Sequence, residues 1–352
     1  MIRKTAHRPG LLAAAMLIAV YSIGVSFVTG CGDGRTPLVL YSPHGRNLLE
    51  LLEGEFERLN PSVDVRWLDM GSQEVFDRVR SEQANPQADI WFGGPDVIFA
   101  RGAEKELLQP FQPTWADQLP PESRDAGDLY FGLYLAVPIL MFNSDAVSGD
   151  EIPTDWDDLL NERWKDRVII RDPLASGTMR TAFGMILAKS VAETAETTAG
   201  LEWLRRLDAQ TSDYVVNPAL LFEKLARQEG LLTIWELTDA LLLQQRGAPI
   251  GYRFPLSGTP VIDDSIGLVA GAKHPEEAKR FIEWVGSKEV LALVAHEVFR
   301  LPARLDVPSE ELPEWAQSAL ADIVRAEVDW SLIADRGQEW MRQWDREVRG
   351  RG

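Results

Sequence analysis

Short apolar runs alternate with amphipathic stretches along most of the chain. Residues 37–42, 63–70 and 88–94 have the composition and alternation of strands, and helical periodicity fills the intervals at 47–61 and 73–83. A strand–helix–strand–helix–strand order predicts a parallel sheet with helices on both of its faces. The pattern therefore predicts the α/β fold class.

The same alternation continues through the second half of the chain. Residues 130–145 form a long strand-like run that is broken by Pro138, which is typical of a segment crossing between two lobes. A helix start is expected within 153–167, with Thr154 or Asp155 as its N-cap. The remaining expected elements are a strand over 168–173, a turn and helix over 174–190, a strand–helix–strand unit over 230–255, a strand, turn and helix over 261–289, and helices from about 310 onward.

The first thirty residues have the pattern of an export signal. Three cations precede an apolar run over 11–28, and small residues then lead to Cys31. The sequence Val-Thr-Gly-Cys at 28–31 resembles a bacterial lipobox, which implies lipidation of the Cys31 thiol at the mature N-terminus. The alternative is a single transmembrane anchor, because the apolar run is just long enough to span a bilayer. Residues 1–30 are thus predicted to be a lipoprotein signal peptide, and 31–36 a flexible tether.

Composition and charge narrow the classes of function. The chain has 352 residues, of which 45% are hydrophobic and 26% charged, so about two globular domains of roughly 150 residues are expected. A formal net charge of -18 argues against binding to nucleic acid. Cys31 is the only cysteine, so no intrachain disulfide can form, and no nucleophile elbow, HExxH motif or phosphate-binding P-loop is present. We expect a protein that is not an enzyme and needs no cofactor.

Five segments in a fixed order carry a family resemblance. They are YSPHG, ADIWFGGPD, PTDWDDLLNERWKDRVIIRDPLASGT, SGTPVIDDSIGLVAGAKHPEEAKRFIEWVGSKE and VDWSLIADRGQEWMRQWDREV. Together they resemble the extracellular solute-binding proteins of ABC importers, in the branch that takes ferric iron, thiamine, phosphonates or sugar phosphates. The resemblance extends over about residues 37–345.

The resemblance implies a two-lobed periplasmic-binding-protein fold of type II, which closes on its ligand. Each lobe is expected to hold a mixed, mostly parallel sheet flanked by helices. The first lobe would comprise 37–138 plus about 261–309, and the second 139–260. Residues 310–352 would form a C-terminal helical segment.

Candidate ligand-binding residues lie where strands of the expected sheets end, because ligands of open α/β sheets bind beyond the carboxyl ends of strands. A Ser-Gly-Thr turn that opens a helix presents hydroxyl groups, backbone N–H groups and the helix dipole to an anion. In the family this turn often meets the ligand. The candidates are Ser42, His44, Gly45, Ser72, Gln73, Gly94, Asp96, Ser176, Gly177, Thr178, Trp235 and Glu236.

Ferric iron is one of the ligands that the resemblance leaves open. Ferric members typically supply two adjacent tyrosines, but Trp235 and Glu236 stand where that pair is expected and the chain has no Tyr-Tyr. If the ligand were ferric iron, His44, Asp96 and Glu236 would be the metal ligands. Trp235 and the neighbouring acids would equally suit an organic ligand or, through cation–π contact, thiamine or a polyamine.

The predicted function is therefore capture of a small ligand, an organic phosphate or phosphonate or Fe(III), in the cleft between two lobes. Hinge closure would deliver the ligand to an ABC permease and its ATPase. The alternatives are a ligand sensor for a membrane-bound signalling system and a binder of thiamine or a polyamine. We expect a monomeric extracytoplasmic lipoprotein held at the membrane through Cys31, with no nucleic-acid partner.

Overall fold

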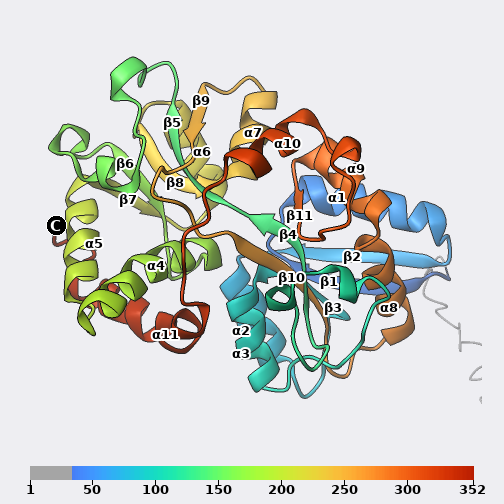
Figure 1. Ribbon diagram of the computed structural model, residues 1–352. Coiled ribbons are helices and arrows are strands. Elements are labelled where there is room, and N and C mark those ends of the chain that lie inside the picture. The colour runs from blue at the N-terminus through green and yellow to red at the C-terminus, as the bar shows by residue number, and fades with distance from the viewer. Residues whose placement is uncertain (1–33) are drawn as a thin grey trace, which may run out of the picture. The chain divides into compact units, whose positions relative to one another are not determined.

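The computed structural model describes residues 34–352, and the chain divides into a unit over 1–35 and a compact unit over 36–352. The second unit carries the whole fold described below (Figure 1). The predicted signal peptide and Cys31 lie outside the described residues. Within the described part of the chain, every helix is too short or too polar to cross a membrane.

The first lobe is built on a six-stranded sheet with the strand order β11-β4-β10-β3-β1-β2. Its strands are β1 (Thr36–Ser42), β2 (Val63–Asp69), β3 (Ile90–Pro95), β4 (Phe131–Ala136), β10 (Ile262–Leu268) and β11 (Leu301–Pro302). The accompanying helices are α1 (Arg46–Leu59), α2 (Ser72–Ser81), α3 (Asp96–Glu104), α8 (Pro275–Val285) and α9 (Lys288–Val298). Helix α1 illustrates why these elements form, since its apolar residues Leu48, Leu49, Leu52 and Phe56 share one face and are buried.

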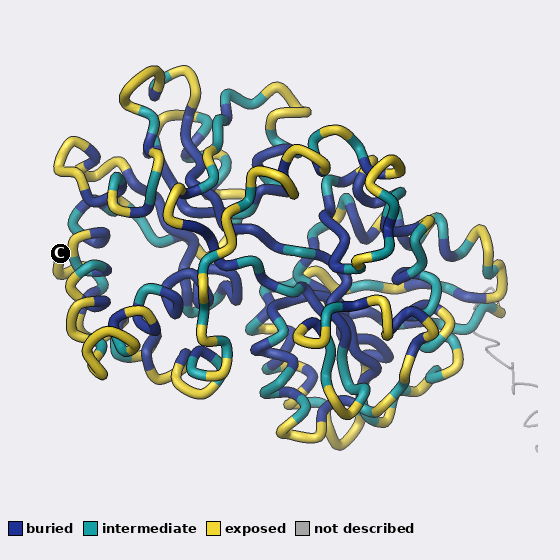
Figure 2. Tube along the Cα trace, viewed as in Figure 1, coloured by how far each residue is buried: buried dark blue, intermediate teal, exposed yellow. Residues whose placement is uncertain are grey.

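The second lobe is built on a five-stranded sheet with the order β7-β6-β8-β5-β9. Its strands are β5 (Pro138–Asn143), β6 (Val168–Arg171), β7 (Thr211–Val215), β8 (Leu232–Glu236) and β9 (Ile250–Arg253). Its helices are α4 (Gly177–Thr194), α5 (Thr198–Gln210), α6 (Pro218–Ala226) and α7 (Leu237–Gln245). Figure 2 shows the inner strands of both sheets largely in the buried colour, with exposed residues gathered on the outer helices and loops.

The two sheets are mixed, and the expectation that they are mostly parallel is wrong. Strand β1 runs parallel to β2 and β3, and β6 runs parallel to β7 and β8. The other pairings, of β10 with β3 and β4, of β11 with β4, and of β5 with β8 and β9, are antiparallel. The physical reason is that β4 leaves its sheet, and β5 and β10 enter theirs, directly through the crossing segments, without the helical crossover that a parallel neighbour requires.

The chain passes between the sheets at Val137, which lies alone between β4 and β5. Pro138, expected at the end of the first lobe, is instead the first residue of a strand in the second sheet. The return passage runs from β9 to β10, where the Thr259 hydroxyl donates to the carbonyl of Pro138 at 2.6 Å. The two crossing segments are therefore tied to each other at the level of the hinge.

The segment over 153–167 folds differently from the expected helix. It forms two short 3₁₀ helices, η4 (Trp156–Leu160) and η5 (Glu162–Trp164). Asp155 is the N-cap of η4, and its side chain accepts from the backbone N–H of Trp156.

The C-terminal helices are α10 (Glu314–Asp322) and α11 (Trp330–Glu347). Helix α11 packs both on α4 of the second lobe and on α3 of the first. Its Trp344 ring lies edge-on to Phe183 at a centroid distance of 5.5 Å, and its Gln338 accepts from Arg101 of α3 at 3.4 Å. The C-terminal segment thus contacts the two lobes at once rather than belonging to one of them.

Candidate functional site

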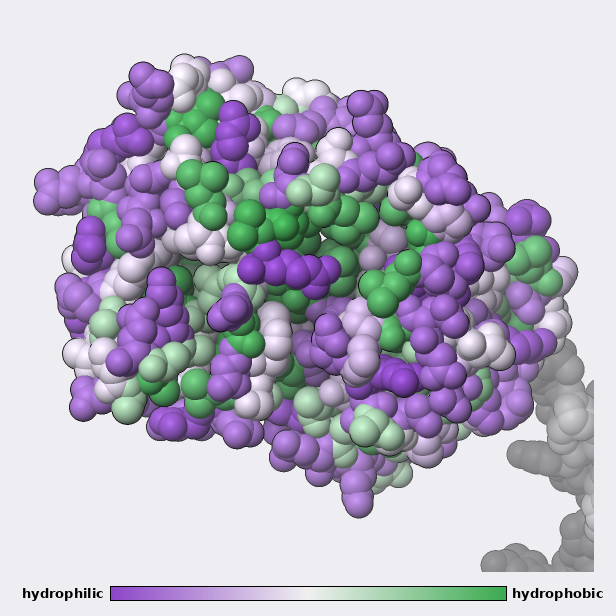
Figure 3. Space-filling view, viewed as in Figure 1, coloured by the Kyte–Doolittle hydropathy of each residue, from purple (hydrophilic) through white to green (hydrophobic). Residues whose placement is uncertain are grey.

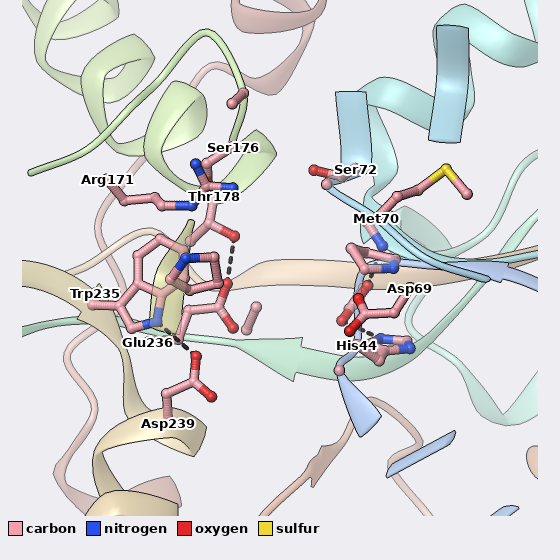
Figure 4. A pocket seen from close by; sticks show the side chains of 18 of the residues that line it. His44, Asp69, Met70, Ser72, Arg171, Ser176, Thr178, Trp235, Glu236 and Asp239 are labelled. Atoms are coloured by element: carbon pink, nitrogen blue, oxygen red, sulfur yellow. Dashed lines mark hydrogen bonds and ion pairs between the residues drawn. The ribbon is translucent and has the colours of Figure 1, made fainter. Parts of the chain in front are cut away.

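A cavity of about 610 Å³ lies where strand ends of the two sheets face each other. Its walls come from the loops after β1, β2, β3, β6, β7 and β8 and from the start of β10. This position follows the rule that ligands of open α/β sheets bind beyond the carboxyl ends of strands, and the volume suits a small molecule. We call this space the cleft. Figure 4 shows polar side chains of the two lobes facing each other across it.

The first-lobe wall is organised around the buried carboxylate of Asp264 on β10. His44 Nε2 lies 2.7 Å from Asp264 Oδ2, and the backbone N–H of Gly94 donates to the other carboxylate oxygen. His44 Nδ1 lies 3.1 Å from Ser42 Oγ. Arg300 donates to the His44 carbonyl at 3.1 Å, and its guanidinium lies 4.0 Å from Asp264. Three strand ends and the residue before β11 are thereby joined into one network.

The partners of His44 assign its protonation state. Its side chain is only 2% exposed, and burial lowers its pKa despite the nearby Asp264 carboxylate. The ring is therefore neutral, with Nε2–H donating to Asp264 and Nδ1 accepting from the Ser42 hydroxyl. Burial by itself would raise the pKa of Asp264, but His44, Arg300 and the Gly94 N–H together hold it below its ordinary value.

The second-lobe wall begins at the end of β6 and continues into α4. Arg171, the last residue of β6, is only 5% exposed, and burial lowers the pKa of its guanidinium. Its Nη1 donates to the Val215 carbonyl at 3.3 Å, whereas its buried Nε has no partner. Ser176 is the N-cap of α4 and accepts from the backbone N–H of Met179. A guanidinium and a helix N-terminus therefore lie in the same wall, and both favour a negative charge.

Two carboxyl groups occupy the rest of this wall. Glu236 ends β8 and accepts from the Thr178 hydroxyl, while Asp239 accepts from the Trp235 indole N–H at 2.6 Å. Burial raises the pKa of both, and Asp239 raises that of Glu236 further. Arg300 is the cation that opposes both shifts. These carboxyls accept from neutral donors only, so they remain open to a hydroxyl or ammonium group of a ligand.

One side of the cleft is held by a direct contact between the lobes. The backbone N–H of Gly177 donates to Ser72 Oγ of the first lobe at 3.0 Å. A Cβ at position 177 would lie 2.7 Å from Pro95 Cδ and 2.8 Å from Ser72 Oγ. Only glycine therefore lets α4 approach the first lobe this closely without a shift of its neighbours.

The structure brings together most of the predicted ligand-binding residues. Those that line the cleft are His44, Gly45, Ser72, Gly94, Ser176, Thr178, Trp235 and Glu236. Those that do not are Ser42, Gln73, Asp96 and Gly177. Ser42 is covered by His44, Gln73 turns away to bond Arg180, and the N–H of Gly177 is occupied by Ser72. Burial beside Asp263 raises the pKa of Asp96 to about 7, and the Asp96 carboxyl is withdrawn behind the cleft wall.

The ligands predicted for ferric iron are not assembled. Among residues 34–352, no group of three or more His, Cys, Asp or Glu side chains is placed to hold a metal ion. His44 uses both ring nitrogens within the protein, and Asp96 lies outside the cleft, so Glu236 is left without the other two donors. The structure described here therefore does not bring His44, Asp96 and Glu236 together around one point.

The charged lining residues that were not predicted from the sequence include Asp69, Glu74, Arg171, Asp264 and Arg300. Arg171 and Asp69 carry a usable signal, since each lies within two residues of the end of an expected strand, on the edge where ligands bind. Asp264 and Arg300 carry none, because their place depends on β10 and β11 returning to the first sheet after the whole second lobe.

The fold and the cleft define a two-lobed binding protein. The sequence profile of the bacterial extracellular solute-binding protein family matches residues 85–327, and the chain belongs to that family. It is 25% identical over 317 residues to a probable ABC transporter periplasmic-binding protein of Sinorhizobium fredii, covering 89% of this chain and 86% of the other. It is 28% identical over 282 residues to a putative 2-aminoethylphosphonate-binding periplasmic protein of Salmonella typhimurium, covering 77% and 79%.

This chain also has a fold similar to that of a solved structure. A periplasmic binding protein from Actinobacillus pleuropneumoniae with bound fructose-6-phosphate superposes with a TM-score of 0.78 at 23% identity, covering 91% of this chain and all of the other. The predicted class, an extracytoplasmic solute-binding protein of the ABC-importer type, is confirmed by the family match and these relatives. The two-lobed α/β fold is confirmed as well.

Proposed function

We propose that this protein captures a small organic phosphate or phosphonate in the cleft and delivers it to an ABC permease. The observation that carries the choice of ligand is Arg171. Its guanidinium is almost fully buried in the cleft wall, yet its Nε has no partner within the protein. A buried guanidinium with an unsatisfied N–H and no carboxylate partner is costly, and a ligand oxyanion is the group that satisfies it with suitable fork geometry.

The surroundings of Arg171 support the same charge. The N-terminus of α4 at Ser176 and that of α6 after Asn217 both border the cleft. Helix N-termini favour anions through their free N–H groups and the helix dipole. Two relatives point the same way, since one is named for 2-aminoethylphosphonate and the other was solved with a sugar phosphate.

The rest of the ligand would meet Trp235, Glu236 and Asp239. An indole face packs on a carbon skeleton, and the two carboxyls accept from hydroxyl or ammonium groups. A ligand of this kind would touch both lobes, bind the closed arrangement most tightly and shift the population toward it. Closure around Val137 and the β9–β10 passage would then present both lobes together to the permease.

The location of the protein outside the cytoplasm follows from its family, which is extracellular. We further propose that residues 1–30 are removed on export, and that a lipid on Cys31 holds the monomeric protein at the membrane. Mass spectrometry of the protein extracted from membranes tests this. A diacylated N-terminal peptide starting at Cys31 is expected, and a peptide that still contains residues 11–28 would contradict it.

Tryptophan fluorescence tests the choice of ligand, because Trp235 lines the cleft. The panel holds 2-aminoethylphosphonate, fructose-6-phosphate, ferric citrate, thiamine and spermidine. We expect saturable changes with a phosphorus compound, and Arg171→Met to remove them. Saturation by ferric citrate, thiamine or spermidine alone would contradict the proposal.

A further inference from the structure

A second cavity, of about 330 Å³, lies where α2, α4 and α11 meet. It is lined by Gln73, Asp77, Arg80, Leu174, Arg180, Gln338, Met341 and Arg342. It shares no lining residue with the cleft. We call it the rear cavity. Because α2 belongs to the first lobe and α4 to the second, the rear cavity is bordered by both lobes and by the C-terminal helix, and it opens to solvent at Arg80 and Arg342.

The helices present their polar residues to this space by ordinary helical spacing. Gln73, Asp77 and Arg80 follow one another at intervals of four and three on α2. On α11, Met341 and Arg342 lie three and four residues after Gln338, which places both on the same side of the helix as Gln338. The lining is therefore a shared face of the two helices rather than a chance meeting of side chains.

The charge of the rear cavity is opposite to that of the protein as a whole. Three arginines, Arg80, Arg180 and Arg342, line it together with a single carboxylate, Asp77, in a chain of formal net charge -18. Burial lowers the pKa of a fourth arginine, Arg101, and the nearby Arg80 and Arg342 lower it further, against the opposing effect of Asp77 and Glu104. Gathering like charges in one place is unfavourable unless an opposite charge joins them.

The protein supplies little of that opposite charge. Asp77 is already bonded to Arg80 at 3.0 Å and accepts from the Gln73 amide at 3.0 Å. Arg342 has no carboxylate partner within residues 34–352. The positive charge around the rear cavity therefore exceeds the negative charge that the described residues bring to it.

Arg180 is the most deeply placed of these cations, at 7% exposed. Its Nη1 donates to Gln73 Oε1 at 2.5 Å and its Nη2 to the Leu174 carbonyl at 3.0 Å, both neutral acceptors. Its Nε is buried without a partner. Burial first, and Arg101 second, lower its pKa to about 10. A buried guanidinium with a free N–H donor and no carboxylate contact favours the binding of an anion.

We propose that the rear cavity binds a multiply charged oxyanion of the phosphate or sulfate type, held by Arg80, Arg180 and Arg342. Guanidinium groups match tetrahedral oxyanions with paired N–H donors, which a cluster of three provides from separate helices. The anion would join α2 of the first lobe to α4 and α11. It would therefore be distinct from the ligand of the cleft, and the inference does not rest on the identity of that ligand.

Equilibrium dialysis of the full chain in detergent against labelled inorganic phosphate tests the proposal. We expect one phosphate per protein to be bound at the rear cavity, displaced by sulfate, and Arg342→Gln to weaken its binding about tenfold or more. Arg80→Gln should act in the same direction. Arg346→Gln is the matched control, because Arg346 lies on the same helix outside the cavity with 65% of its side chain exposed, and it should leave binding unchanged.

Thermal unfolding separates loss of the site from loss of the fold. Without phosphate or sulfate, Arg342→Gln should melt no lower than the parent protein, because it relieves repulsion between arginines. Added phosphate should raise the midpoint of the parent protein by several degrees and that of Arg342→Gln much less. The proposal is overturned if no phosphate binds. It is equally overturned if Arg171→Met abolishes all phosphate binding while Arg342→Gln and Arg80→Gln leave it intact, because the phosphate would then lie in the cleft.

Discussion

On the first-lobe wall of the cleft, the buried carboxylate of Asp264 receives the imidazole of His44 and the backbone of Gly94, with Arg300 alongside. On the second-lobe wall, Arg171 has a free Nε, and the buried carboxyls of Glu236 and Asp239 meet only neutral donors. The first-lobe wall pairs its charged groups within the protein, whereas the second-lobe wall leaves charged and polar groups available to a ligand. The difference suggests a division of labour, in which the first lobe provides a fixed platform and the second recognises the ligand.

The division predicts that changes on the first wall reduce stability, whereas changes on the second reduce affinity. The proposed division is contradicted if variants of either wall change stability and affinity to the same extent. The variants below test it in order of expected effect.

The largest effect is expected from Asp264→Asn. The change removes the charge that joins His44, Gly94 and Arg300, and it takes away the carboxylate that lies 4.0 Å from the Arg300 guanidinium. The free energy of unfolding should fall by about 2–4 kcal/mol. Urea denaturation followed by tryptophan fluorescence measures this.

The neighbouring residue provides a matched control for Asp264→Asn. Burial is the largest cause that raises the pKa of Asp263 to about 6, so its ionisation at pH 8 costs stability. Asp263→Asn should therefore be neutral or stabilising at that pH. Equal losses from the two variants would show that Asp264 has no special place in the platform.

The second effect is expected from Arg171→Met, which keeps the apolar stem of the side chain but removes its donors. Affinity for the phosphorus compound identified by fluorescence should fall by about 10- to 100-fold, the range for a hydrogen bond to a charged group. The free energy of unfolding should change by less than about 1 kcal/mol, because no ion pair in the protein is lost. Isothermal titration calorimetry and urea denaturation together measure the two quantities. A loss of stability with unchanged affinity would reverse the proposed roles of the walls.

A smaller effect is expected from Thr178→Val. The variant keeps the shape of the side chain and removes the hydroxyl that donates to Glu236, whose pKa should then rise further. Affinity should fall by roughly 3- to 10-fold in calorimetry, as for the loss of about one hydrogen bond. Thr178→Ser restores the donor and should bind like the parent protein. A serine variant as weak as the valine variant would exclude the hydroxyl as the cause.

The smallest effect is the titration of His44 itself. Because burial lowers its pKa, the unfolded state takes up a proton at a higher pH than the folded state does. Stability should therefore be lost as the pH falls below about 6.5, the ordinary value for histidine. Heteronuclear NMR should place the His44 midpoint below that value, with His44→Gln identifying the signal. A midpoint above it would mean that His44 is a cation paired with Asp264.

Much of the fold was predictable because local patterns dominate in the first lobe. The strands and helices from β1 to β3 lie within a few residues of their expected bounds, since each has a clear apolar period. The strand directions were not predictable from the same pattern, because an antiparallel β10 and a parallel β3 have similar apolar runs. The segment that begins at Trp156 also differs from the prediction, because it forms a 3₁₀ helix that ends at Leu160 rather than a longer α-helix.

The site was predictable only where it follows chain-local rules. Ser176 and Thr178 could be found because a Ser-Gly-Thr turn opens a helix after a strand. Asp264 could not, because it reaches the cleft only through the pairing of β10 between β3 and β4. Arg342 of the rear cavity was equally beyond sequence reasoning, since its neighbours on α2 lie more than two hundred and fifty residues earlier in the chain.

The position of β10 also has a consequence for how the protein is made. This strand lies between β3 and β4 in the first sheet, yet it is synthesised only after the entire second lobe. The strand that links β3 to β4 is therefore missing while most of the chain is synthesised. Pairing between segments so far apart in the sequence is intrinsically slow. The first lobe can therefore complete its sheet only after β10 and β11 have been synthesised. For a protein of an extracellular family, we expect this late completion to leave the first lobe easier to unfold while the chain is exported.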